Sequence, residues 1–136
     1  MTTTMTPSRI LAAYRAVLEL SNIVLPYKAA RSVMVLKKRL ADENDTVVDM
    51  EKKLAVEFGG EEIPGGAYEF PDVDTNVRFQ EALKEAKEQE DDIRLPTVDL
   101  SKYTSLIRIS PASIEALDGI VIFEKGPKQE EEDENG

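Results

Sequence analysis

Several groups of residues have types and spacings that could support chemistry. The acidic run Asp42-Glu43-Asn44-Asp45, with Asp49 beyond it, superficially resembles a calcium-binding loop. It lacks the mid-loop glycine and the terminal glutamate at the spacing that such loops require, and the surrounding pattern favours helix. We therefore predict no metal site at these positions.

The glycine pairs Gly59-Gly60 and Gly65-Gly66 are the next candidates, because glycine-rich loops can cradle phosphate. Phosphate loops lead into the N-terminus of a helix, whereas here the first pair follows a predicted helix and the second lies in a loop. Both pairs are better explained as turns. We predict that neither binds a cofactor.

Carboxylate pairs can act as general acid and base when a pocket separates their pKa values. The chain has 27 acidic residues, and nothing in the sequence marks one pair as buried. It contains no histidine and no cysteine, which excludes Ser-His and Cys-His nucleophilic sites and any disulfide. We therefore predict no catalytic residue, and that the protein is not an enzyme.

The charge is divided unevenly along the chain. The net charge is −10, yet residues 1–40 hold seven basic residues and one acidic residue, so residues 41–136 sum to −16. Internal neutralisation or simple solvation would explain the asymmetry, and contact with a charged partner is the functional alternative. The candidate partner-binding residues are Lys28, Arg31, Lys38 and Arg39 in the basic part and Glu81, Glu85 and Glu88 in the acidic part.

The element that must position these residues is one long helix over 26–60. Apolar residues recur along a single stripe, broken only by Glu43: Ala29, Val33, Leu36, Leu40, Val47, Met50, Leu54 and Phe58. Pro26 suits its first turn and Gly59-Gly60 its end. At 1.5 Å per residue the helix would be roughly 50 Å long, so other parts of the chain or a partner must cover it. Met34 and Val35 lie off the stripe, and we expect its first half to be surrounded.

Two shorter helices are expected to cover the two halves of this rod. Thr6 and Pro7 begin a helix over 7–20 that doubles back along the first half. Its buried face is Ile10, Leu11, Tyr14, Val17 and Leu18. A helix over 75–92, capped by Asp74 or Thr75, returns antiparallel along the second half. Its seam is Phe79, Leu83, Ala86 and Ile93.

The remaining segments are expected to be short or irregular. Residues 1–5 look frayed, and residues 59–74 form a loop with a brief extended segment at 67–70. Residues 93–109 read as extended, followed by a short helix from Ser110 to Gly119 with Ile114 and Leu117 buried, and by an apolar run at 120–123. The tail 124–136, with five consecutive acidic residues at 130–134, is expected to be disordered.

Together these patterns predict a mainly α fold with minor β structure in one domain, residues 1–123. A small head (6–40 and 93–123) would carry an antiparallel, coiled-coil-like helical hairpin (41–92). No apolar run approaches the roughly 20 residues that span a bilayer, and the first residues lack a signal-peptide pattern. We expect no membrane association.

Three segments carry a resemblance to known proteins: residues 11–40, 79–90 and 106–123. They include Leu25-Pro26-Tyr27-Lys28 at the start of the long helix and Ile109-Ser110-Pro111 before an apolar end. In these features the chain resembles a group of small, mainly helical proteins of unknown function encoded by tailed bacteriophages and prophages. The resemblance implies a viral context, in the cytoplasm of a bacterial host or associated with the virion. It transfers no functional residue.

The sequence leaves more than one function open. The leading expectation is a non-enzymatic phage-type accessory protein that acts through protein–protein contact in an assembly or scaffold-like role. A homodimer is one form that such contact could take. An alternative is an acidic mimic of nucleic acid that inhibits a host defence or DNA-handling enzyme. Nucleic-acid binding through the basic residues is the least favoured, because no glycine-rich or aromatic-interleaved basic motif supports it. No small-molecule substrate is expected.

Overall fold

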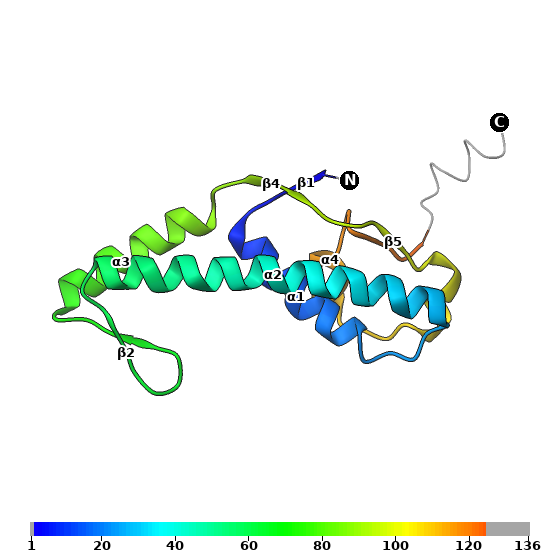
Figure 1. The fold of residues 1–136 in the computed structure, drawn as a ribbon, viewed down its shortest axis with the longest axis horizontal. Coiled ribbons are helices and arrows are strands. Elements are labelled where there is room, and N and C mark those ends of the chain that lie inside the picture. Colours follow the sequence, from blue (N-terminus) through cyan, green and yellow to red (C-terminus); the bar gives the residue numbers. More distant parts are fainter. Residues whose placement is uncertain (1, 125–136) are drawn as a thin grey trace.

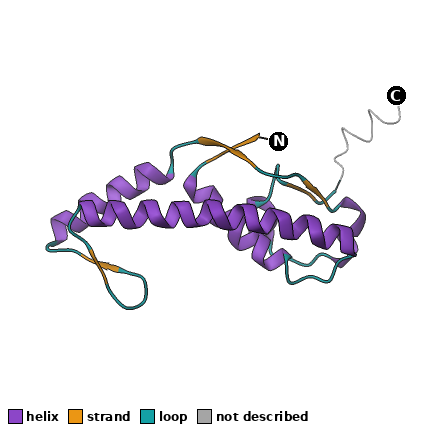
Figure 2. Cartoon of the chain, in the orientation of Figure 1, coloured by secondary structure: helices purple, strands orange, loops and turns teal. Residues whose placement is uncertain are grey.

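The structure is a computed structural model in which residues 2–124 are described. The fold is mainly helical, as predicted, with three short two-stranded sheets spaced along its length (Figure 2). The elements, in chain order, are β1 (Thr2–Met5), α1 (Pro7–Leu20), α2 (Tyr27–Glu57), β2 (Glu61–Glu62), β3 (Tyr68–Glu69), α3 (Val73–Lys87), β4 (Asp91–Arg94), β5 (Val98–Asp99), the 3-10 helix η1 (Ser101–Leu106), α4 (Pro111–Ala116) and β6 (Val121–Ile122).

Helix α2 is the central rod of the described chain, and α1, α3 and β5 pack along it (Figure 1). Its 31 residues confirm the predicted long helix, and at 1.5 Å per residue it is about 46 Å long. It ends where Gly59 adopts a left-handed φ of 76°. Gly59 N–H then donates to the Val56 carbonyl at 2.9 Å and Gly60 N–H to the Ala55 carbonyl at 2.8 Å, which satisfies two carbonyls of the last turn.

The head (residues 2–40 and 93–124) is built on the first half of α2. Helix α1 has the predicted bounds and cap, since the Thr6 hydroxyl accepts from Arg9 N–H at 3.2 Å, and it lies along α2 (Figure 1). Helix α4 packs on α1, and β5 and β6 pair in parallel beside them. The buried core contains Met5, Ile10, Ala13, Ala16, Val17, Leu20, Ala29, Val33, Leu36, Leu40, Val47, Ile93, Leu95, Val98, Leu100, Leu117, Ile120 and Val121.

The prediction that residues 1–5 are frayed was wrong for the described residues. Strand β1 pairs antiparallel with β4, with Thr3 opposite Ile93 and Met5 opposite Asp91, and Met5 is 1% exposed. The same pairing shortens the third helix, which ends at Lys87 rather than at residue 92. Ile93 consequently lies in the head core on a strand and not in a helical seam. A ladder between segments almost 90 residues apart has no local sequence signal.

The arm (residues 41–92) is the second half of α2 with the β2–β3 hairpin and α3. Helix α3 begins two residues earlier than predicted because Asp72 is its cap: the Asp72 carboxylate accepts from Thr75 N–H at 2.7 Å and from the Thr75 hydroxyl at 2.8 Å. The arm has its own small core of Ala55, Phe79 and Leu83. Figure 1 shows α3 running back antiparallel to α2, as predicted.

Four aromatic rings hold the end of the arm together. Phe79 lies 6.3 Å from Phe58, 6.1 Å from Tyr68 and 4.8 Å from Phe70 between ring centroids. The first two contacts are edge-to-face, a favourable geometry for aromatic pairs. The brief extended segment predicted at 67–70 is present as β3, and it brings Tyr68 and Phe70 onto Phe79.

Several predicted burials in the head were wrong. Met34 and Val35 are 52% and 48% exposed, so the first half of α2 is covered on one side only and is not surrounded. In α4, Leu117 is buried as predicted, but Ile114 is 44% exposed and Ser113 takes the inward place. Residues 101–106, expected to be extended, form η1. Helical period fixes which residues share a face, whereas the number of covered faces depends on how many segments pack there.

The two cores meet within the arm's part of α2. Val47 is buried in the head core and Met50 packs against it, whereas Leu54 and Phe58 pack on the arm core. The hairpin was predicted to begin at residue 41. Contact with the head core instead continues along α2 as far as Met50, and contact with the arm core begins at Leu54. The predicted disordered tail lies, apart from Glu124, outside the described residues.

Candidate contact surfaces

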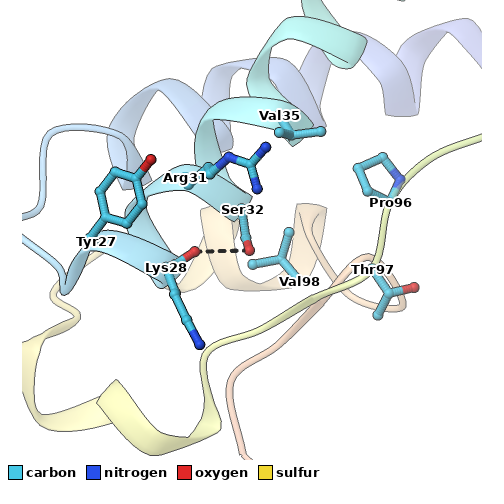
Figure 3. A pocket seen from close by; sticks show the side chains of 8 residues that line it. All are labelled: Tyr27, Lys28, Arg31, Ser32, Val35, Pro96, Thr97 and Val98. Atoms are coloured by element: carbon cyan, nitrogen blue, oxygen red, sulfur yellow. Dashed lines mark hydrogen bonds between the residues drawn. The ribbon is translucent and has the colours of Figure 1, made fainter.

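A groove lies between the first part of α2 and the segment that includes β5. We call it the basic groove, lined by Tyr27, Lys28, Arg31, Ser32 and Val35 of α2 and by Pro96, Thr97 and Val98 of the segment that includes β5. It encloses about 460 Å³. Figure 3 shows the α2 side chains along one wall and Pro96 and Thr97 across from them, with the Ser32 hydroxyl donating to the Lys28 carbonyl at 3.0 Å. Tyr27 is 79% exposed at its mouth.

The four predicted basic residues have two different environments. Lys28 and Arg31 line the basic groove, and Lys38 lies exposed further along α2. Within residues 2–124 none of these three forms an ion pair. Arg39 is used internally: its guanidinium lies 2.6 Å from the Glu43 carboxylate, and its Nε donates to the Arg94 carbonyl at 3.1 Å. Arg39 therefore ties β4 to α2.

The predicted acidic residues form an exposed stripe on α3. Glu81, Glu85 and Glu88 recur at helical spacing on the side opposite the buried Phe79 and Leu83, and Glu88 is the last, capping residue. In the part of the chain that the structure describes, none of the three is paired with a cation. Their carboxylates are free to meet a charged partner.

A second groove runs along the arm between α2 and α3. We call it the arm groove, lined by Thr46, Asp49, Met50, Lys53, Leu54, Glu57 and Ala86, with a volume of about 450 Å³. Met50, Leu54 and Ala86 are each only partly buried there. A hollow of about 330 Å³ continues from Met50 and Ala86 towards Met5 and Ile93 at the junction with the head. The apolar stripe of α2 is therefore buried in the head and only partly buried along the arm.

Two carboxylates have environments that lower their pKa. Glu19 accepts hydrogen bonds from the Ser113 hydroxyl and from Ser110 N–H at 3.0 Å, and these bonds hold its pKa below the ordinary 4.5. The bonds from Thr75 N–H and hydroxyl lower the pKa of Asp72 in the same way. Each carboxylate sits at the N-terminus of a helix, α4 or α3, so each has a structural explanation as a cap.

The acidic run of residues 42–45 with Asp49 lies on continuous α2, where the sequence predicted unbroken helix. Within residues 2–124 no group of three or more acidic side chains is placed to hold a metal ion, and no buried side-chain polar atom lacks a partner. Neither of these observations singles out a reactive group.

Sequence reasoning missed the wall of the basic groove that lies across from α2. Pro96, Thr97 and Val98 come to α2 only because β4 and β5 run alongside it, and no local pattern indicates that path. Val35 was misassigned as buried for the same reason. The exposed apolar side chains beside Lys28 and Arg31 are what a sequence search for unpaired apolar positions could have found.

Comparison of the chain with protein-family models, with curated proteins and with solved structures found no match. No helix among the described residues is long and apolar enough to cross a membrane. The contact surfaces are therefore interpreted from their own chemistry.

Proposed function

We propose that this protein is a non-enzymatic accessory protein of the phage type, which acts through protein–protein contact in an assembly or scaffold-like role. The observation that carries the proposal is the arm groove. Along it Met50 and Leu54 continue the α2 stripe that is buried in the head, with Ala86 of α3 beside them, and all three are only partly buried. A groove of this kind fits an apolar helix from a partner.

The rest of the arm supports a contact role. Valines stand exposed on both of its helices, at Val48 and Val56 on α2 and at Val73 and Val77 on α3. Exposed apolar residues gathered on a projecting element are typical of an interaction surface, whereas single ones are ordinary. A second copy of the chain is the simplest partner and the first to test.

The test is solution mass by light scattering at about 50 mM and about 500 mM salt, since charge contacts are largely screened at the higher value. A contact through the arm groove persists at high salt, and it is lost in Met50→Glu. Ala86→Gln, which fills the groove without removing core volume, provides a second variant. Val24→Glu, on an exposed head residue, is the control that should leave the mass unchanged.

A monomer at both salt concentrations contradicts self-assembly through the arm. Circular dichroism of each variant separates a lost contact from a lost fold. Association that survives both Met50→Glu and Ala86→Gln removes the arm groove from the proposal.

A second candidate is an acidic mimic of nucleic acid, favoured by the arm's charge. Residues 41–92 hold seventeen acidic and five basic residues, a net charge of −12. A mimic would compete with duplex DNA for a host DNA-handling enzyme, and its binding would weaken steeply with salt. Replacing Glu81, Glu85 and Glu88 with glutamine should then abolish the competition while leaving assembly through the arm groove intact.

A further inference from the structure

The head and the arm have opposite net charges. The head holds ten basic and five acidic residues, a net charge of +5, against −12 for the arm. The two charges lie at different ends of one rigid helix (Figure 1). A molecule of this kind attracts the unlike end of a second copy, because complementary potentials steer encounter and fix orientation.

We propose that the basic groove of one molecule receives the acidic face of α3 from a second copy, in a head-to-arm contact. The proposal deepens the assembly role proposed above and rests on it, but it uses a different surface from the arm groove. The contact is electrostatic, and the two surfaces are tested under different salt conditions.

The basic groove has the features of a receiving surface. Lys28, Arg31 and Lys38 recur along the side of α2 opposite the buried Val33 and Leu36, and the three have no ion-pair partner in residues 2–124. Val35 lies between Arg31 and Lys38, half exposed, and Tyr27 stands at the mouth. Cations flanking an apolar and an aromatic side chain suit a surface that packs as well as pairs charges.

The acidic face of α3 matches the groove in spacing. Arg31 and Lys38 are seven residues apart on α2, and Glu81 and Glu88 are seven residues apart on α3. Both separations correspond to a rise of about 10.5 Å, so two helices laid side by side can form both charge pairs at once.

The spacing also selects a direction. In the antiparallel arrangement Arg31 faces Glu88 and Lys38 faces Glu81, and Lys28 lies beyond the end of α3, where it meets no cation of that helix. The parallel arrangement pairs Arg31 with Glu81 instead and sets Lys28 opposite Arg78, a repulsive contact. Antiparallel docking is therefore favoured.

The contact cannot form within one molecule. Phe79 fixes the beginning of α3 against Phe58, and Glu81 lies only two residues further along. Lys38 is sixteen residues before Leu54, an α2 residue that also packs on that core, and sixteen residues correspond to roughly 24 Å along the helix. The occupant of the groove must come from another chain.

The contact is heterologous, because the two surfaces differ, so each added molecule leaves one groove and one α3 face free. At about 50 mM salt the mass of the wild-type chain should rise with concentration beyond twice 15.2 kDa, and at about 500 mM it should fall back to the mass set by the arm-groove contact alone.

Charge reversal provides the decisive test. The head variant Arg31→Glu with Lys38→Glu and the arm variant Glu81→Lys with Glu88→Lys should each weaken self-association at about 50 mM salt by about tenfold or more, because attraction becomes repulsion. An equimolar mixture of the two variants should associate again, since every contact between them is once more between unlike charges. Circular dichroism confirms that both variants fold.

Matched controls change the same number of charges elsewhere. Arg15→Glu with Lys102→Glu alters exposed head residues outside the groove, and Asp45→Lys with Glu69→Lys alters exposed arm residues outside α3. The controls should associate like the wild type at matched salt. Reversals no more damaging than these controls, or a mixture whose mass stays at that of the separate variants, would overturn the proposal.

Other occupants of the groove give distinct results. A wild-type chain that shows no salt-sensitive association until residues 125–136 are removed would assign the groove of the intact chain to its own acidic run at 130–134. A duplex-DNA mobility shift that Arg31→Glu with Lys38→Glu abolishes would assign it to nucleic acid. Either result overturns the head-to-arm contact, whereas salt-resistant association through the arm groove would leave the assembly role standing.

Discussion

The head and the arm share helix α2 but bury very different amounts of apolar surface. Among the described residues, eighteen form the buried head core, and only Ala55, Phe79 and Leu83 form that of the arm. The arm also sets Glu61 directly opposite Glu69 across its hairpin, a like-charge pair that opposes folding. The arm should therefore open more readily than the head, on a local unfolding equilibrium of its own.

The largest effect is expected from the head core. Leu36 is fully buried on α2, and Leu36→Ala should lower the free energy of unfolding by about 3–4 kcal/mol through lost transfer energy and a cavity. Since α2 runs through both regions, thermal unfolding followed by circular dichroism should show both melting earlier. The neighbouring exposed Val35→Ala is the control, with a change within about 0.5 kcal/mol. Equal effects of the two would refute the burial difference.

The next effect is confined to the arm. Phe79→Ala should remove about 3 kcal/mol of local stability, because all three aromatic contacts of the arm core involve this ring. Hydrogen exchange should lose protection in residues 54–87 and retain it in residues 10–20. Phe79→Leu, which keeps much of the volume, should lose less. Loss of protection in α1 as well would mean that head and arm unfold as one unit.

A smaller effect is expected where the two regions join. Met5 is buried on β1, which pairs with β4 at the base of the arm. Met5→Ala should cost about 2 kcal/mol and raise amide exchange in residues 91–94 before it affects α1. Thr2→Ala, on the exposed end of the same strand, is the matched control. If both variants exchange like the wild type, β1 does not connect the arm to the head.

Two of the side-chain caps, Thr6 and Asp72, sharpen the comparison, and Thr6→Ala should cost about 1 kcal/mol. Thr6→Ala removes the cap of α1, and Asp72→Ala removes the cap of α3. The two variants should lose similar amounts of helix stability, but the loss should affect the whole molecule in Thr6→Ala and only the arm in Asp72→Ala. Denaturant unfolding of the whole molecule should register Thr6→Ala, whereas Asp72→Ala should appear mainly in hydrogen exchange of α3. Equal global shifts would contradict separate unfolding of the arm.

The smallest effect is a dependence on pH. The folded-state pKa values of Glu19 and Asp72 are both lowered, first of all by hydrogen bonds from Ser113 and Thr75 respectively. Each carboxylate therefore adds stability that is present above its ordinary pKa of 4.5 or 3.8, and that is lost as the pH falls through the lower folded value.

Melting temperatures measured between neutral pH and about pH 3 should accordingly fall less steeply in Glu19→Gln and Asp72→Asn than in the wild type. Asparagine and glutamine retain an acceptor oxygen and lose only the titration, so the fold should be kept. If the melting temperatures of both variants fall with pH as steeply as that of the wild type, other carboxylates determine the loss of stability in acid.

The reach of sequence reasoning is visible in particular residues. Helix α1 and its Thr6 cap, the length of α2 and the turn at Gly59 all follow from local patterns, and all are present. Among the candidate contact residues, the sequence indicated the charge of Lys28, Arg31 and Lys38, but not the opposite wall of the groove. It also did not indicate that Arg39 would form an ion pair with Glu43 and donate a hydrogen bond to the Arg94 carbonyl.

By itself, the sequence determined the long helix, its apolar stripe and the separation of basic from acidic residues, because period, caps and charge are local properties of the chain. Only the tertiary structure decided that β1 pairs with β4, that Met34 and Val35 stay exposed, and that the seam closes over the head and opens along the arm. These outcomes depend on which distant segments come together. Contacts between segments that are far apart in the sequence cannot be recognised from the local pattern of residues.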